Sequence, residues 1–543
     1  MLNILKKLYK FYYNNYYQDE YVKKFIKHNK KIINLNYKIN NKHKVLFELS
    51  NHKSLITAYS YFSQSIIKNY QYEMIAYTFK KKNNISNYFN SLFKETIKKE
   101  YESFGVFKFL SPNNNFYLKK KAKEIYKKKI EKLKNKKDIE KIKINGILIG
   151  DLLYDAYLKN CKKPTIDLSD ENFKLYSIEF IEIFLFWKNY IFQNDVRFVV
   201  CNHTVYESAI TIRIAFTKKN CKCFQVTPES IFQLTKKNKF AYKQFEVFNY
   251  KKIFKKFSLK DQRKFRKIAN QRIKLRFKGV VGVDMGYSTK SGYGSKYFKK
   301  RIIKKSSKLK ILIATHDFLD NPHAYSKNIF PDFYEWMKYL CEFSKNNKYD
   351  WYVKCHPDFR IESLLILKSL LKDYPNMKLI NPSTSHHQII KEGINFVFTM
   401  YGTIGWEYPY LGVQCLNATY NNPRYRYNFN INPKHFYEYK NIIKNLNSYI
   451  GKIKEIQRKE ILEFYYLNYI HFKNRTNWLI NDIDKAVERL GGFRKRKYSL
   501  TKSLFYKYWL ENFNLKNHNH TLNSLKKFIK SRKYFLSSKE THE

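Results

Sequence analysis

Polar side chains suited to holding a phosphate stand behind two short apolar runs in the second half of the chain. One run ends in Lys-Cys-His at 354–356, and the other leads into Tyr-Gly-Thr at 401–403. A strand that passes through a polar turn into a helix places such side chains at the carboxyl edge of a parallel sheet. A cation, an imidazole, a hydroxyl and small glycines that converge there suit phosphate oxygens, so the pattern predicts a nucleotide-phosphate site. The candidates for this site are Lys354, His356, Gly402, Thr403, Glu407 and His316.

Successive side chains of a strand point to opposite faces, and this alternation predicts where Lys354 and His356 point. Lys354 and His356 are expected on one side of their strand, with Cys355 on the other. Together they would stabilise a leaving phosphate or diphosphate. The alternative for His356 is an imidazole that is satisfied by a backbone carbonyl at the strand end. Glu407 has two readings that stay open, a partner for ribose hydroxyls or a carboxylate that favours the start of its own helix.

Other nucleotide and metal signatures do not fit this part of the chain. The segment 401–405 is neither the six-position dinucleotide fingerprint nor a Walker loop, which disfavours dinucleotides and ATP. His316 follows the apolar run 310–314 and is expected at the same sheet edge. His386 and His387 are adjacent, and neighbours on a helix diverge by about 100°, so both cannot readily serve one ion. We therefore predict no metal and no cofactor.

Three residues in the first half are candidates for a general base. Asp151, His203 and Glu229 each follow an apolar run. A base that deprotonates a hydroxyl acceptor must be a carboxylate or an imidazole within hydrogen-bond reach of it. Asp151 is the first choice and His203 the second, and the alternative for Asp151 is a capping or turn residue.

Short apolar runs alternate with segments of helical periodicity through most of the chain. This alternation predicts an α/β protein with two Rossmann-like, doubly wound domains that face a cleft. Basic helical extensions are expected at both ends. The expected strands are 45–49, 72–79, 147–149, 196–201 and 222–226 in the first half, and 310–314, 351–355, 377–380, 395–400 and 413–417 in the second.

The predicted domains follow from the same pattern. Residues 1–44 are a basic helical segment, and 45–300 form the acceptor-side domain with a Lys-rich insertion. Residues 301–490 form the second domain, which holds the phosphate site. Residues 491–543 are a basic tail with few fold signals.

The charge of the chain is extreme. Its 543 residues carry a formal net charge of +60, which favours polyanionic partners. The alternative is a background bias toward Lys, Asn, Ile, Tyr and Phe, because the excess is spread along the chain. The positive charge and the 48 Tyr and 44 Phe residues also suggest an alternative class of function, nucleic-acid binding. Aromatic rings can stack on bases. No aromatic RNA-binding motif, helix-turn-helix or zinc-finger spacing supports it, so we expect no specific nucleic acid.

Cysteine usage and hydropathy bear on location. Seven scattered cysteines argue against a disulfide framework, and Cys221 and Cys223 lack a second pair at zinc spacing. No secretion signal or membrane-spanning segment is recognised, so a cytoplasmic protein is expected. The basic, aromatic segment 1–25 suits either an anionic membrane face or an ordinary surface helix.

The motifs resemble those of a known family. The runs at 354–357, 401–403 and 407–412, with Gly-Asp-Leu-Leu-Tyr-Asp at 150–155 and Asn-His-Thr-Val-Tyr at 202–206, resemble bacterial capsule or surface polysaccharide biosynthesis proteins with a GT-B glycosyltransferase fold. The pair of His-Pro and hydroxyl turn is also similar to capsule Kdo transferases and bacterial sialyltransferases.

The resemblance implies a function. It implies that His356 and Thr403 hold the donor phosphate of a nucleotide-sugar, with a CMP-sugar favoured. The acceptor would be a hydroxyl of a surface polysaccharide or lipid-linked glycan. A transferase of polyol phosphate from a CDP-linked donor is the close alternative. The acidic-acidic-Gly base motif of those families has no clear copy here, because Asp151 is preceded by Gly150.

Overall fold

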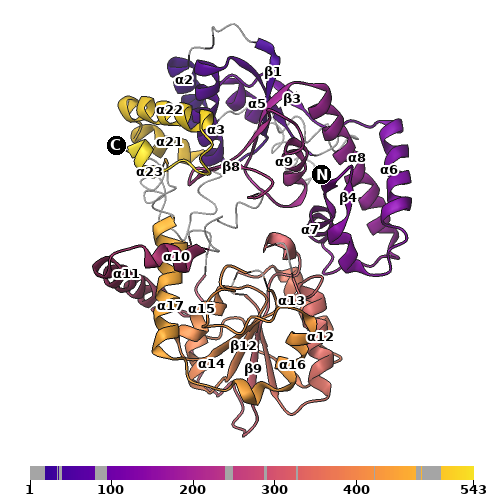
Figure 1. Ribbon diagram of the computed structural model, residues 1–543, viewed down its shortest axis with the longest axis vertical. Coiled ribbons are helices and arrows are strands. Elements are labelled where there is room, and N and C mark those ends of the chain that lie inside the picture. The colour runs from indigo at the N-terminus through magenta and orange to yellow at the C-terminus, as the bar shows by residue number, and fades with distance from the viewer. Residues whose placement is uncertain are drawn as a thin grey trace, which may run out of the picture.

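The protein consists of two α/β lobes that lie one above the other along its long axis (Figure 1). The computed structural model describes residues 19–33, 35, 40–79, 95–238, 249–285, 290–325, 328–356, 358–420, 422–472, 478–479 and 503–542. We call the lobe around the six-stranded sheet the N lobe and the lobe around the five-stranded sheet the C lobe.

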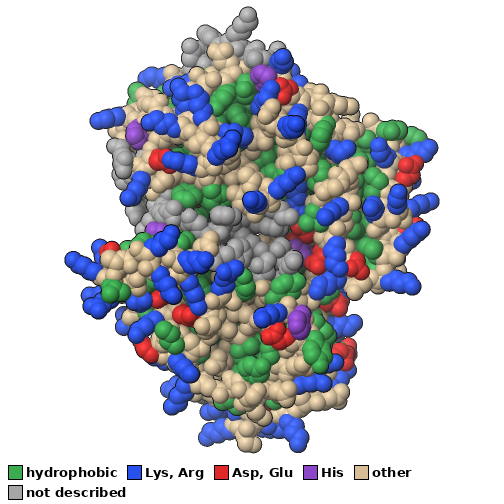
Figure 2. Space-filling model, viewed as in Figure 1, with side chains coloured by type: hydrophobic (Ala, Val, Ile, Leu, Met, Phe, Trp, Pro, Cys, Tyr) green, Lys and Arg blue, Asp and Glu red, His purple; other side chains and the backbone are tan. Residues whose placement is uncertain are grey.

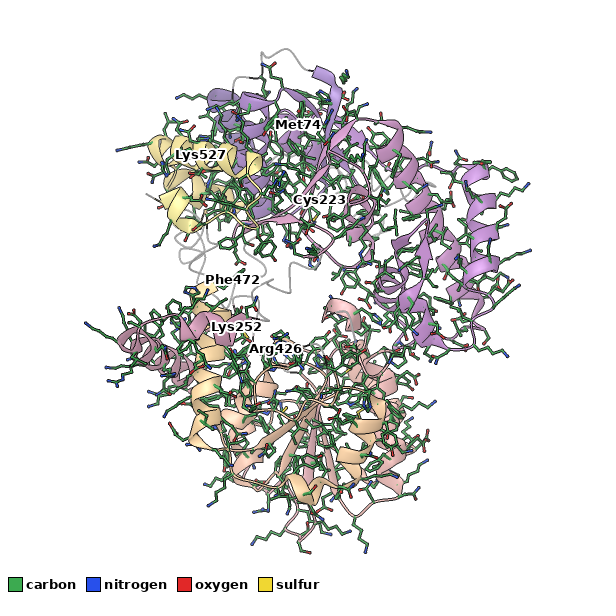
Figure 3. All side chains as sticks on the ribbon, in the orientation of Figure 1. Met74, Cys223, Lys252, Arg426, Phe472 and Lys527 are labelled. Carbon is green, nitrogen blue, oxygen red and sulfur yellow. The ribbon has the colours of Figure 1, made fainter. Side chains whose placement is uncertain are left out.

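The N-lobe sheet has the strand order β3-β2-β1-β6-β7-β8. All neighbours are parallel except β7 and β8, which form an antiparallel hairpin. The strand order reverses between β1 and β6, which is where ligands bind in doubly wound sheets. Met74 and Cys223 mark β2 and β7 inside this lobe (Figure 3). The strands are β1 (Asn40–Glu48), β2 (Tyr72–Tyr77), β3 (Lys108–Leu110), β6 (Val196–Cys201), β7 (Lys222–Val226) and β8 (Ile231–Leu234).

Helices cover both faces of this sheet because its strands are apolar on both sides. On β1, Val45 and Phe47 belong to one buried core, and Leu46 belongs to the core of the opposite face. The helices of the lobe are α2 (Glu20–Ile32), α3 (Lys53–Asn69), α5 (Glu95–Glu102), α6 (Phe116–Lys129), α7 (Gly150–Asn160), α8 (Glu171–Gln193) and α9 (Ile210–Ala215).

The C-lobe sheet is fully parallel, with the order β11-β10-β9-β12-β13. Ile311 and Ile313 of β9 face one core and Leu312 faces the other. The predicted fold class, an α/β protein with two Rossmann-like domains, is therefore confirmed. The strands are β9 (Lys310–Ala314), β10 (Asp350–Lys354), β11 (Met377–Leu379), β12 (Phe396–Thr399) and β13 (Gln414–Asn417), and the helices are α12 (Phe333–Lys345), α13 (Ile361–Leu371), α14 (His386–Lys391), α15 (Ile404–Tyr410) and α16 (Phe436–Lys444).

Three further helices sit beside the C lobe. Helices α10 (Tyr250–Lys255) and α11 (Leu259–Phe277) pack on α17 (Glu455–Tyr465) and on the π-helical turn that follows it. The rings of Phe265 and Tyr466 stack with centroids 4.2 Å apart, and Arg266 pairs with Glu463 at 2.6 Å. These contacts fix α11, whose last turn reaches the carboxyl edge of the C-lobe sheet.

The C-terminal segment folds onto the N lobe, although its sequence carries few fold signals. Helices α21 (Leu504–Glu511), α22 (Leu515–Lys530) and α23 (Ser538–His542) lie beside α2 and α3 (Figure 1). Tyr506 stacks on Phe25 with ring centroids 4.0 Å apart. The parts of the predicted terminal segments at 1–18 and 491–502 lie outside the described residues.

The expected strand at 147–149 is present as β5 (Ile147–Leu148), but it does not join the N-lobe sheet. Among the described strands, β5 pairs with β4 (Lys143–Ile144) alone, in a separate antiparallel hairpin. Asn145 and Gly146 in the turn both have positive φ, 49° and 75°. An Asn-Gly pair favours such a hairpin, and α7 then begins at Gly150. Gly150 is required because a Cβ there would lie 1.7 Å from the carbonyl O of Ile139.

Basic side chains are spread over the surface. Lys and Arg cover the visible face of both lobes without gathering on one of them (Figure 2). Among the described helices, none combines the length and the apolar character that crossing a membrane requires.

Candidate functional site

A pocket of about 250 Å³ opens at the carboxyl edge of the C-lobe sheet. Strands β9, β10 and β12 end at it, and the start of α15 forms part of its wall. The end of α11 and the residues 280–282 and 290–293 close it from the other side. All six residues predicted for the phosphate site line this pocket: Lys354, His356, Gly402, Thr403, Glu407 and His316.

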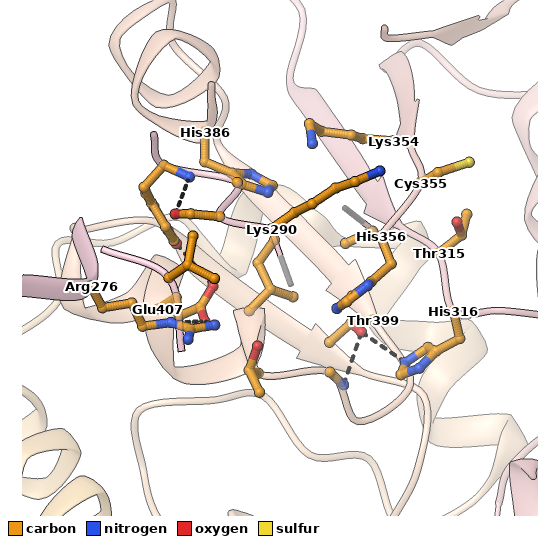
Figure 4. Close-up of a pocket in the computed structure, with 18 of the residues that line it drawn as sticks. Arg276, Lys290, Thr315, His316, Lys354, Cys355, His356, His386, Thr399 and Glu407 are labelled. Atoms are coloured by element: carbon orange, nitrogen blue, oxygen red, sulfur yellow. Dashed lines mark hydrogen bonds and ion pairs between the residues drawn. The ribbon is translucent and has the colours of Figure 1, made fainter. Parts of the chain in front are cut away.

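His356 presents a hydrogen-bond donor to the pocket. The backbone N–H of Asp358 donates to its Nδ1 at 3.1 Å, so the proton of the neutral ring resides on Nε2. The surrounding pocket walls desolvate the ring and lower its pKa, which keeps it neutral near pH 7. The ring points toward Thr399 and His316 (Figure 4). A neutral imidazole with Nε2–H is a donor for a phosphate oxygen.

Lys354 is a buried cation. Its side chain is 1% exposed, and its Nζ donates to the carbonyl O of Pro382 at 3.0 Å. Within the described residues, no carboxylate forms an ion pair with it. Burial lowers its pKa to about 8, and the nearby Cys355 acts in the opposite direction. Two of its three N–H groups remain for other acceptors.

His316 and Thr399 organise the turn that follows β12. The backbone N–H of Tyr401 donates to His316 Nε2 at 3.3 Å, and the Thr399 hydroxyl is 3.2 Å from the same nitrogen. Gly402 N–H in turn donates to Thr399 Oγ1 at 3.2 Å. Burial, and then the neighbouring His356, lower the pKa of His316 to about 3. His316 is thus a neutral acceptor that shapes the wall, and a Cβ at Gly402 would come within 2.9 Å of Thr399 Oγ1.

Thr403 keeps its hydroxyl for the pocket. It is the N-cap residue of α15, but its side chain makes no capping hydrogen bond. Its carbonyl accepts from the N–H groups of Trp406 and Glu407. The half-buried hydroxyl lines the cavity beside Gly402.

Glu407 connects the pocket to its cover. Arg276 donates to Glu407 Oε1 from Nε at 2.9 Å and lies 2.7 Å from it through Nη2. Tyr293 OH donates to Oε2 at 3.0 Å. Although burial opposes it, Glu407 raises the pKa of Arg276. Both carboxylate oxygens are therefore engaged, and a ribose contact would have to share them.

The two adjacent histidines have separate partners, as their helical geometry requires. His386 Nδ1 lies 2.8 Å from Tyr408 OH, and His387 Nε2 lies 2.8 Å from the carbonyl O of Phe277. Only His386 lines the pocket. No group of three His, Cys, Asp or Glu suited to a metal ion occurs in the described part of the chain.

Asp151 does not follow a strand of the N-lobe sheet. It stands in the first turn of α7, it is 6% exposed, and both its oxygens are bound by Arg213, with Nη2 to Oδ2 at 2.7 Å. The cause is the hairpin at 143–148, which takes the place of the expected sheet strand. Its position agrees with the alternative of a structural residue.

His203 and Glu229 do follow strands of the N-lobe sheet. His203 comes after β6 and is half-buried. Burial and, to a smaller extent, the nearby Lys159 lower its pKa to about 4. Asp320 of the C lobe acts in the opposite direction and raises the pKa. Tyr206 OH donates to Asp320 Oδ1 at 2.6 Å, so this edge faces the C lobe. Glu229 is exposed in the turn between β7 and β8. Neither residue lines the described pocket.

The sequence did not single out the residues that cover the pocket. Arg276 and Tyr293 hold Glu407, and the exposed Lys290 reaches over the cavity toward the end of β10 (Figure 4). The available signal in the sequence was the concentration of five glycines between 279 and 294. Gly279 and Gly294 pack so closely that a Cβ on Gly279 would lie 2.5 Å from the Gly294 Cα.

Comparisons with known proteins add little at this point. No family model matches the sequence, and no curated protein matches it. Among solved structures, a UDP-GlcNAc 2-epimerase from Neisseria meningitidis, bound to UDP-GlcNAc, aligns with 78% of this chain and 99% of its own at 10% identity and a TM-score of 0.22. The wall teichoic acid polymerase TagF aligns with 94% of this chain and 98% of its own at 12% identity and a TM-score of 0.19. At such scores neither similarity carries an argument about activity.

Proposed function

We propose that this protein is a glycosyltransferase that binds a nucleotide-activated sugar through its phosphate in the C-lobe pocket. The observation that carries the proposal is the buried ammonium of Lys354, which has no carboxylate partner among the described residues and lines the same cavity as His356 and Thr403. Burying an uncompensated charge is costly, so such a cation at a sheet edge is best explained by an anionic ligand.

In this proposal the pocket stabilises the leaving group. The Nε2–H of His356, the ammonium of Lys354 and the hydroxyl of Thr403 donate to phosphate oxygens, where negative charge develops as the bond to the sugar breaks. Lys290 would add a further positive charge at the pocket mouth. The acceptor hydroxyl would enter from the N-lobe side and lose its proton to a base there. We retain His203 for this role because it is a neutral imidazole at the facing edge.

The finer assignments are proposals of the same kind. We favour a CMP-sugar donor and a surface polysaccharide or lipid-linked acceptor, with no metal or other cofactor required. A CDP-linked polyol-phosphate donor would use the same anion site. The enzyme would act in the cytoplasm, in peripheral contact with the anionic inner face of the membrane.

A thermal-shift panel of CMP, CDP, UDP and GDP tests the proposal. A ligand that binds only the folded state raises the unfolding temperature. We expect CMP or CDP to stabilise the protein, and we expect His356→Ala to abolish the shift. The exposed His435→Ala is the matched control. If none of the four nucleotides stabilises folded protein, the proposed function is wrong; salt-sensitive nucleic-acid binding that survives His356→Ala would favour the other class.

A further inference from the structure

The pocket wall that contains His316 is supported from the other lobe. His316 stacks on Phe333 with ring centroids 4.5 Å apart and planes 9° apart. It also accepts the N–H of Tyr401, whose ring lies 4.7 Å from its own. His316 and Tyr401 line the cavity, and Phe333 packs against both rings as support. We call these three residues the histidine wall.

The first support reaches this wall through Phe333. Phe333 is the first residue of α12, and Asp332 caps that helix by accepting the N–H of Glu335 at 2.8 Å. The other oxygen of Asp332 accepts Tyr154 OH at 2.5 Å and Thr165 OH at 2.6 Å, both from the N lobe. Tyr154 and Asp332 are fully buried. The residue that caps the start of α12 is therefore held by two N-lobe hydroxyls.

The second support reaches the wall through Tyr401. Tyr401 OH donates to the carbonyl O of Asn321 at 2.8 Å. Two residues later, His323 Nδ1 lies 2.5 Å from Asp155 Oδ1, and its Nε2 lies 3.2 Å from Glu140. His323 and Asp155 are each 2% exposed. The segment 315–325, which follows β9 and includes His316, is thereby anchored to α7 through His323.

The two sets of contacts start from adjacent residues of α7 in the N lobe, Tyr154 and Asp155. We propose that Tyr154 and Asp155 of α7 are positioning residues for the anion pocket of the C lobe, acting through the histidine wall. This positioning role would explain the motif at 150–155, in which the sequence analysis placed Asp151 as a candidate general base. It rests on the proposed function only for the identity of the anion, because the supports themselves are contacts within the protein.

Substitution of two tyrosines on α7 tests the inference. Tyr154→Phe removes one of the two hydroxyls that donate to Asp332 and keeps the ring. Tyr157→Phe is the matched control: Tyr157 is also fully buried, and its OH donates to Asp170 at 3.2 Å within the N lobe. In protein labelled with ¹⁵N-histidine, we expect Tyr154→Phe, but not Tyr157→Phe, to shift the ring resonances of His316, assigned with His316→Gln. Equal spectra for Tyr154→Phe and wild type would overturn the inference, as would an equal shift in the control.

Ligand binding gives a second measurement. We expect Tyr154→Phe to weaken CMP binding by about two- to thirty-fold in titration calorimetry, the range for couplings of this kind. In His316→Ala, adding Tyr154→Phe should weaken binding no further, because the effect passes through His316. Full additivity would contradict a positioning role. If the wild type binds no nucleotide, the proposed function fails, whereas the histidine resonances still decide the present inference.

Discussion

Two buried charges, one in each lobe, have opposite surroundings. Asp151 of the N lobe is held by Arg213 through both carboxylate oxygens, away from the described pocket. Lys354 of the C lobe donates to one backbone carbonyl and lines the pocket. Removing one member of a buried ion pair leaves the other charge uncompensated and destabilises the fold. A buried charge without a counter-charge, in contrast, is suited to binding a ligand of opposite charge. The environment, and not the residue type, therefore separates the structural charge from the candidate binding group.

The largest effect is expected at the N-lobe pair. Asp151→Asn leaves the Arg213 guanidinium buried without its counter-charge, so the free energy of unfolding should fall by about 3–5 kcal/mol in urea denaturation. CMP affinity, measured below the unfolding transition, should stay within two-fold of wild type. The exposed Asp167→Asn is the control and should change little. A large loss of affinity at unchanged stability would place Asp151 in the reaction and remove the contrast.

The C-lobe charge should behave in the opposite way. Lys354→Met keeps the shape of the side chain and removes a charged donor, so CMP affinity should fall by about 10- to 100-fold in titration calorimetry. Because the cost of burying the ammonium disappears, the free energy of unfolding should not decrease. Unchanged affinity, or a stability loss as large as that of Asp151→Asn, would contradict the interpretation of Lys354.

The pH dependence of stability and of CMP affinity further tests the difference between Lys354 and Asp151. The folded-state pKa of Lys354 is lowered to about 8 by burial, below its ordinary value of 10.5. Between these values the unfolded chain binds the extra proton, so this group makes the free protein more stable as pH rises through that window. Binding of CMP, which needs the ammonium, should weaken as pH rises above 8, by at most tenfold per unit. Lys354→Met should flatten this affinity profile; an identical profile in the variant would argue against the assignment.

The smallest effect is expected for the neutral donor in the pocket. Thr403→Val removes an uncharged donor and retains the side-chain volume, and a typical hydrogen bond contributes about 0.5–1.5 kcal/mol. CMP affinity should fall by about two- to tenfold, with little change in unfolding temperature. Thr217→Val, on the N lobe, is the control. An effect as large as that of Lys354→Met would mean that Thr403 supports the turn and is more than a ligand contact.

The sequence predicted the C-lobe site better than the N-lobe site for a physical reason. Strands β9, β10 and β12 are apolar on both faces and end in polar turns, so local pattern alone placed His316, Lys354 and Thr403 on one edge. At 147–149 a similar apolar run belongs to a small hairpin outside the main sheet. Only the Asn-Gly pair at 145–146 indicated this hairpin in the sequence. The cover of the pocket was missed because Arg276 meets Glu407 across 131 positions, a contact that no local pattern records.

The most direct test of the account is a crystal structure of the protein with CMP. The account predicts that the phosphate lies within hydrogen-bond distance of His356 Nε2, Lys354 Nζ and the Thr403 hydroxyl. A phosphate bound elsewhere, with the C-lobe pocket empty at saturating CMP, would contradict it.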